Sequence, residues 1–222
     1  MNEVEAAMRD GVRHAVLESL KNYLEVPRTD WLRRWPGQTV LNCSQVHWTS
    51  EVEVALTKNG NQGMWDCYNQ QVQQLEDSVQ LVRGKLSTLE RITIGALCVI
   101  DVHARDVTKK AAEVGVDNVR HFEWISQLRY YWRNSPDEPF GADGDLFAMM
   151  VSSLRPYGYE YLGNTLRLVI TPLTDKCYLT LMGALQVRAV WCRGGGGGGG
   201  WRAMAVWMST ALLSIARGDG RR

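Results

Sequence analysis

Two cysteine–histidine pairs have the residue types and the spacing that a metal site could use. Cys43 and His47 lie four residues apart, which would put them on one helix face, and Cys98 with His103 forms a looser pair. A zinc site requires three or four protein ligands, and neither pair has a second pair at a matching spacing. We therefore interpret these residues as buried thiols and partly exposed imidazoles. A free-standing metal enzyme is the weaker hypothesis.

Phosphate chemistry would need a different signature. A phosphate-binding loop has the pattern G-x-x-x-x-G-K followed by Ser or Thr, so that backbone amides, the lysine and the hydroxyl serve the phosphates and Mg²⁺. Here Gly84 and Lys85 are followed by Leu86, and the run of seven glycines at 194–200 ends in Trp201. The sequence also contains no G-x-S-x-G and no H-E-x-x-H string. The residues alone therefore indicate no catalytic centre.

The charge of the chain is unevenly distributed. The 222 residues have a net charge of +1, but residues 187–222 contain six arginines, no lysine and one acid, which is +5. The first 186 residues hold 25 − 6 = 19 basic and 24 − 1 = 23 acidic groups, which is −4. An acidic body argues against nucleic-acid binding. The apolar segment 203–216 would span about 21 Å as a helix, too short for a bilayer of about 30 Å, so we expect no membrane span.

The elements that would position these residues are mostly helical. Apolar residues recur every three to five positions from Val4 to Leu24, which predicts a first helix that ends before Pro27. Ser50 and Glu53 form a capping-box pattern that predicts a helix start there. The heptad-like stripe from Tyr68 to Leu89 predicts a long amphipathic helix with its glutamines, Gln71 among them, on the polar face. Two more helices are predicted over 102–114 and 119–132.

The pattern changes after residue 133. Prolines, acids and glycines over 134–145 predict a loop, and the run Leu166–Thr171 predicts a short buried strand. A helix with an apolar face at Tyr178, Leu181, Met182 and Leu185 follows, with Thr174 as its expected N-cap. The predicted fold class is therefore mainly α: a helical bundle, then a strand, turn and helix that begin an incomplete α/β module, then a disordered glycine-rich tail.

Several long strings occur together and in one order. They are VPRTDWLRRWPGQTVLNCSQVHWTSEVEVAL, ALCVIDVHARDV, HFEWISQLRYYW, YGYEYLGNTLRLVITPL and TDKCYLTLMGAL. This set resembles dynein heavy chains over about residues 10–186, and the string VHARD is closer to the axonemal than to the cytoplasmic type.

The resemblance implies a division of the chain. Residues 1–153 would be the C-terminal helical part of the linker, the lever that swings across the motor ring, and residues 154–186 would begin the first AAA+ module. The adenine side of the main ATPase site would then be formed by Leu168, Val169, Ile170, Pro172, Leu173 and Thr174. ATP and Mg²⁺ are the cofactors of that family, whose members drive minus-end-directed movement on microtubules in cilia and flagella.

The resemblance also carries expectations about partners and location. It implies the rest of the dynein motor ring, dynein intermediate and light chains, and a microtubule contacted through parts outside this sequence. The location would be the cytoplasm and cytoskeleton, in the ciliary axoneme. Without a phosphate loop, this chain by itself is expected neither to bind ATP tightly nor to hydrolyse it.

Two questions stay open from the sequence. The pattern is lost after Gln186, so we interpret residues 187–222 as translated intron or a mispredicted exon, not as a domain. The alternative function is a non-enzymatic helical scaffold that binds partners through aromatic faces such as Trp124, Tyr131 and Trp132.

Overall fold

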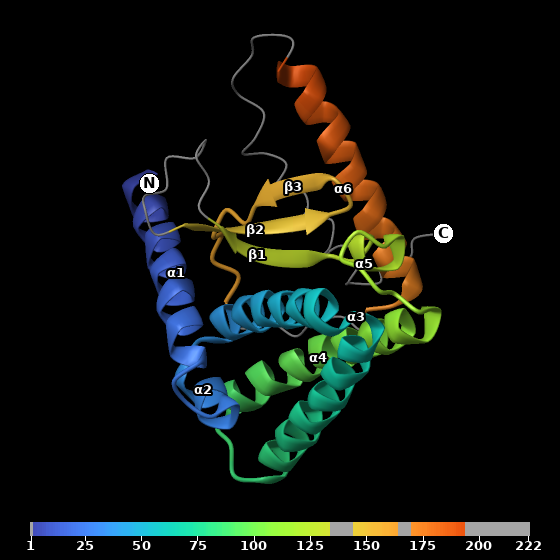
Figure 1. The fold of residues 1–222 in the computed structure, drawn as a ribbon. Coiled ribbons are helices and arrows are strands. Elements are labelled where there is room, and N and C mark those ends of the chain that lie inside the picture. Colours follow the sequence, from blue (N-terminus) through green and yellow to red (C-terminus); the bar gives the residue numbers. More distant parts are fainter. Residues whose placement is uncertain (1, 134–143, 164–169, 194–222) are drawn as a thin grey trace, which may run out of the picture.

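The computed structural model describes residues 2–133, 144–163 and 170–193, which form six helices and one small sheet (Figure 1). In chain order the elements are α1 (Asn2–Tyr23), α2 (Arg28–Arg34), α3 (Gly37–Arg83), α4 (Thr88–Val114), α5 (Phe122–Ile125), β1 (Arg129–Arg133), β2 (Asp145–Met150), β3 (Ser153–Pro156) and α6 (Pro172–Arg193).

The first helix confirms the expectation from the apolar recurrence. It ends at Tyr23, four residues before Pro27, and Pro27 then precedes α2 as its N-cap residue. Proline has no backbone N–H and fixes φ near −65°, so it suits a boundary between helices better than a helix interior. The chain can therefore turn at this point and bring α2 back against α3.

The long helix α3 corrects the predicted helix start at Ser50 and Glu53, which lie inside it. A break occurs instead at Gly60, where φ is 55° and ψ is −135°. A left-handed φ of this kind is easily adopted only by glycine. Near the break, a Cβ on Gly63 would lie 2.4 Å from the carbonyl oxygen of Ala55, so the backbone on the two sides of the bend approaches closely. The two limbs of α3 therefore point in different directions (Figure 1).

The predicted stripe from Tyr68 to Leu89 is divided between two helices. Helix α3 ends at Arg83 with Gly84 as its C-cap, and α4 begins after Ser87. Ser87 and Glu90 form a complete capping box, because each side chain accepts a hydrogen bond from the other residue's backbone N–H. Gln71, expected on the polar face, is 7% exposed. More of the surface of the second limb of α3 is therefore buried than its apolar stripe predicts.

The three-stranded antiparallel sheet was not predicted. The expected helix over 119–132 is confirmed only at Phe122–Ile125, because α5 has only four residues and Arg129–Arg133 pairs with β2. The register places Tyr131 opposite Phe147, and β2 pairs in turn with β3, with Phe147 opposite Pro156. Aromatic residues favour strands as well as helices, so the run RYYWR fits both structures in isolation. Of the expected loop, residues 134–143 lie outside the described residues.

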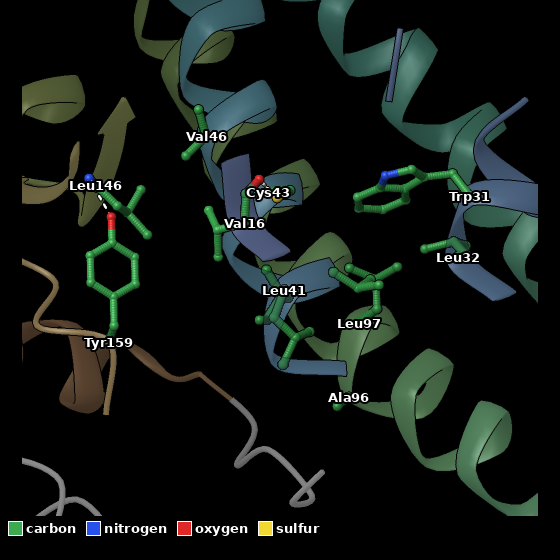
Figure 2. Close-up of a cluster of buried hydrophobic side chains, with 12 residues drawn as sticks. Val16, Trp31, Leu32, Leu41, Cys43, Val46, Ala96, Leu97, Leu146 and Tyr159 are labelled. Carbon is green, nitrogen blue, oxygen red and sulfur yellow. Dashed lines mark hydrogen bonds between the residues drawn. The ribbon is translucent and has the colours of Figure 1, made fainter. Parts of the chain in front are cut away.

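Two apolar clusters hold these elements together. One joins α1, α2, α3, α4 and β2 and contains Val16, Trp31, Leu97 and Leu146, each with no exposed surface. Figure 2 shows members of this cluster converging from separate helices. The second cluster lies around the bend of α3 and includes Trp124, which is also fully buried.

The predicted class, mainly α with a helix at the C-terminal end, is confirmed for the described residues. Most of the predicted strand Leu166–Thr171 and the glycine-rich tail from residue 194 onward lie outside them. Within the same ranges, no helix combines the length and the apolar character needed to cross a bilayer.

Candidate functional site

The residues expected on the adenine side are only partly brought together. Leu168 and Val169 lie outside the described residues. Ile170 and Pro172 line a groove beside α4, whereas Leu173 is 71% exposed and neither it nor Thr174 is among the groove residues. Ile170 and Thr171 precede α6 without belonging to a strand. Of the six predicted residues, two, Ile170 and Pro172, therefore line the same groove.

The start of α6 corrects the predicted N-cap. Thr171, not Thr174, caps this helix: its hydroxyl accepts from the backbone N–H of Thr174 at 3.3 Å, and its carbonyl accepts from Asp175 N–H at 3.0 Å. Pro172 then occupies the first helical position, where its missing N–H costs nothing. Asp175 lies in the first turn, where the helix dipole favours an acidic group. The sequence contained this signal, since Thr-Pro is a common opening of a helix.

The groove has a volume of about 560 Å³ and lies between α4, α5 and residues 170–175. Its apolar lining residues are Val99, Val102, Val107, Ala111, Ile170 and Pro172. Its polar lining residues are Cys98, His103, Asp106, Lys110, Glu123, Gln127, Thr171 and Asp175. A groove of this size, lined by apolar side chains with polar groups among them, can accommodate a small ligand.

The charged groups in the groove partly neutralise one another. His103 Nε2 lies 3.9 Å from Asp175 Oδ1, and Lys110 donates a 2.8 Å hydrogen bond to Glu123. Burial lowers the pKa of His103 and raises the pKa of Asp175, and each group opposes the shift of the other. Burial likewise raises the pKa of the Cys98 thiol. A thiol held protonated is a poor nucleophile, so the groove supports ligand binding better than covalent catalysis.

Hydrogen bonds of the buried Tyr159 hold the segment that precedes the groove residues in the chain. Tyr159 is 3% exposed, and its hydroxyl donates to the Asp145 carboxylate and accepts from Leu146 N–H at 2.9 Å (Figure 2). Burial, followed by the bond to Asp145, raises the pKa of Tyr159. Tyr159 has a positive φ of 51°, which is unfavourable for a residue with a Cβ, and it follows Gly158 with φ of 78°. The backbone conformation at 158–159 is therefore held by specific contacts of Tyr159 to the start of β2.

Gln38 in the first turn of α3 provides the next contact. Its amide group donates to the Glu160 carbonyl at 2.7 Å and to the Tyr157 hydroxyl at 3.0 Å, and it accepts from Leu162 N–H at 3.0 Å. Arg155 donates to the carbonyl of Leu185 in α6. The Gln38 bonds thus join segments that are more than 100 residues apart in the chain. Sequence reasoning missed Gln38 and Arg155, because a lone glutamine or arginine has no recognisable pattern.

Comparisons with known proteins give these contacts a family context. A family model described as the hydrolytic ATP binding site of the dynein motor region matches residues 157–208. The chain is 46% identical over 187 residues to human dynein axonemal heavy chain 3 and 46% identical over 188 residues to human dynein axonemal heavy chain 1, which is 84% and 85% of this chain. Mouse dynein axonemal heavy chain 12 is 45% identical over 185 residues, or 83% of the chain. The chain belongs to the dynein heavy chain family.

The chain spans about 4% of the length of the first two of these dynein heavy chains and 6% of the third. The ATP-binding match begins at Tyr157, directly after β3, so its first residues are those held by Gln38 and Tyr159. The match ends at residue 208 and so includes residues beyond Gln186. Helix α6 also continues past Gln186 to Arg193.

The remaining chemical hypotheses from the sequence gain no support. Cys43 donates to the carbonyl of Val16, and His47 stacks on Tyr23 with ring centroids 3.9 Å apart, so the two side chains have different partners. Among the described residues, no three His, Cys, Asp or Glu side chains come together as a metal site. Trp124, proposed for an aromatic binding face, is fully buried and packs against Trp48. The dynein heavy chain relationship therefore remains the better guide to function.

Proposed function

We propose that residues 1–153 form the force-transmitting end of a dynein linker and that residues 154–186 form the adenine-side entrance to the main ATPase site. The parent activity would be ATP-driven, minus-end-directed movement along microtubules in the axoneme of cilia and flagella. The proposal is supported by the similarity to axonemal heavy chains and by the ATP-binding family match that begins at Tyr157.

One observation carries the proposal: the bundle and the ATP-binding segment are joined by side-chain contacts as well as by the chain itself. Gln38 of α3 binds the backbone at Glu160 and Leu162, and Tyr159 binds the start of β2. A lever must be attached rigidly to the site that drives it. Directional, buried hydrogen bonds provide such an attachment, because breaking them leaves unpaired polar groups away from water.

The fit to ATP is partial. Ile170 and Pro172 contribute apolar groups to the groove, as contact with an adenine ring would require. Leu168, Val169, Leu173 and Thr174 are the other residues that the family resemblance proposes for the adenine side. The sequence has no phosphate-loop lysine and hydroxyl to hold the phosphates and Mg²⁺. When bound in the parent motor, ATP supplies the free energy of phosphate cleavage. Here the described residues would only position the base.

The partners proposed from the family are the rest of the motor ring and the dynein intermediate and light chains. The microtubule would be contacted through parts of the heavy chain that this sequence does not contain. We expect the chain alone to bind ATP more weakly than a Kd of about 1 μM, because the phosphate contacts provide much of the affinity for nucleotides. A Kd tighter than about 1 μM in calorimetry would contradict the assignment of an adenine-side fragment.

A chimeric motor tests the function directly. Residues 2–186 would replace the homologous residues of an axonemal dynein heavy chain motor, and microtubule gliding and ATP turnover would be measured together. The proposal predicts ATP-dependent gliding comparable to that of the unsubstituted motor. ATP turnover without gliding would contradict the linker assignment, and loss of both would contradict the assignment to the linker and the ATPase entrance together.

A further inference from the structure

Gln38 occupies an unusual position for a long polar side chain. It lies in the first turn of α3, next to the buried residues Thr39 and Val40, and is itself only 5% exposed. Burial of an amide is unfavourable unless its hydrogen-bonding groups are satisfied. The amide nitrogen of Gln38 has two acceptors, the Glu160 carbonyl and the Tyr157 hydroxyl, and its oxygen has one donor, Leu162 N–H. Each hydrogen and the oxygen of this side chain therefore has a partner.

The contacts at Glu160 and Leu162 involve the backbone only. A carbonyl at one residue and an N–H two residues later lie on the same edge of an extended chain. The carboxamide of Gln38 therefore pairs with Glu160 and Leu162 in the way that the N–H and C=O of one residue in a parallel neighbouring strand would. This arrangement fixes both the distance and the orientation of the segment relative to α3.

The position of residues 160–162 matters because these residues connect a segment anchored to β2 with the segment that lines the groove. Before them, Gly158 and Tyr159 both have positive φ, and the Tyr159 hydroxyl is bonded to the start of β2. After them, the chain continues toward Ile170 and Pro172 in the groove wall. On the other side of the contact, α3 packs along α4, which forms the opposite wall of the same groove. A displacement of the first turn of α3 would therefore move residues 160–162 with it.

We propose that Gln38 is a positioning residue that couples movement of the helical bundle to the segment leading into the ATP-binding region. It touches no nucleotide, and it acts through the backbone of Glu160 and Leu162. The coupling role rests on the proposed function, whereas the contact of Gln38 with Glu160 and Leu162 can be tested independently of it. Gln73 of the same helix, by contrast, is exposed and bonds only within the helix, to Asp77.

The contact is tested by amide hydrogen exchange on the full 222-residue chain carrying Gln38→Met. Methionine has a similar length and fills the same space but cannot bond to Glu160 or Leu162. Loss of one hydrogen bond should speed exchange of the Leu162 amide about five- to tenfold, while amides in the middle of α4 should keep their rates. Gln73→Met, a matched change at an exposed site of the same helix, should leave Leu162 unchanged. Unaltered exchange at Leu162 in Gln38→Met, or an equal rise throughout the chain, would overturn the proposal.

The mechanical role is tested in the chimeric motor. Gln38→Met should lower the ratio of gliding velocity to ATP turnover, because the linker would slip relative to the ATP-binding segment, and Gln73→Met should leave this ratio unchanged. An unchanged ratio in Gln38→Met would overturn the coupling role. Failure of the chimera without any substitution would count against the proposed function instead, and the exchange rate of Leu162 would still decide whether the contact exists.

Discussion

The helical bundle and the junction at residues 157–163 are stabilised in different ways. In the bundle, Trp31 and Trp124 are fully buried in apolar clusters that several helices share. At the junction, the Tyr159 ring belongs to the first apolar cluster, but the chain is also held by side chains that bond to backbone atoms, with Gln38 and Tyr159 as the principal ones. Apolar packing is non-directional and cooperative, whereas a hydrogen bond is local and orients its partners.

This difference suggests a division of labour. Apolar packing keeps the helices of the bundle together as long as their apolar surface stays covered. The bundle can therefore move as one body. The junction determines the orientation of the segment that the ATP-binding family match begins with. Changes in the bundle should therefore affect global stability, and changes at the junction should affect mainly the position of that segment.

The largest effect is expected for Trp124→Ala. Removing a fully buried indole from the cluster around the bend of α3 should lower the free energy of unfolding by about 3–5 kcal/mol. The matched change Phe122→Ala, two residues away on α5 at a side chain that is 60% exposed, should cost less than about 0.5 kcal/mol. Urea unfolding measures both. Equal losses would contradict the burial assigned to Trp124.

The next effect concerns a charged pair within the bundle. Arg28 Nη2 lies 2.8 Å from Asp101 Oδ2, and both side chains are 15% exposed. Asp101→Asn would leave the guanidinium without its partner and should cost about 3 kcal/mol. The double variant Arg28→Met with Asp101→Leu should be more stable than Asp101→Asn alone, since it leaves no unpaired charge. A double variant that is less stable would show that the pair itself stabilises the fold.

The stability of the bundle should also depend on pH through His47. Burial lowers the pKa of His47 from its ordinary value of 6.5 to about 4. The unfolded chain therefore binds this proton more tightly, and the stability present above pH 6.5 is lost as the pH falls toward 4. Between pH 7.5 and pH 5 the loss should be about 2 kcal/mol.

The variant His47→Gln isolates this contribution from the other three histidines. Its unfolding free energy in urea should fall by about 2 kcal/mol less than that of the wild-type chain over the same pH range. Identical pH dependences would show that His47 is not buried as a neutral group beside Tyr23.

The smallest effect is expected at the junction, for Tyr159→Phe. The ring stays in the apolar cluster, but the hydroxyl bonds to Asp145 and to Leu146 N–H are lost. Because Leu146 N–H is also bonded to the Asp145 carboxylate, the cost should be about 1 kcal/mol. Tyr161→Phe, at a side chain that is 64% exposed, serves as the control and should change nothing measurable in urea unfolding. A loss as large as that for Trp124→Ala would remove the distinction between the two regions.

The sequence predicted those parts of the fold in which local signals and tertiary packing agree. Helix α1 and its end before Pro27 followed from apolar spacing, and the α6 helix followed from the face at Tyr178–Leu185. The Ser-x-x-Glu pattern of the capping box at Ser87 and Glu90 is also present in the sequence. The apolar stripe that continues through Gly84 nevertheless predicted one uninterrupted helix across it. The break at Gly60 could not be predicted, because a glycine within a helix gives no sign of its φ.

The sheet and the junction were beyond sequence reasoning for a different reason. The residues RYYWR suit a helix or a strand, and only pairing with β2 decides between them. The family resemblance located the ATP-binding segment, but it said nothing about Gln38, whose partners lie more than 100 residues away. Contacts between distant side chains and backbone atoms leave no periodic trace in a sequence, so they become visible only in three dimensions.

Hydrogen exchange at increasing urea concentration tests the central claim, that the junction is an independently held attachment on a cooperative bundle. Amides of residues 160–162 should exchange through local opening, with rates that barely change at low urea, while amides buried between α3 and α4 should exchange only by global unfolding, with rates that rise steeply with urea. The same urea dependence and the same opening free energy in both regions would contradict the account.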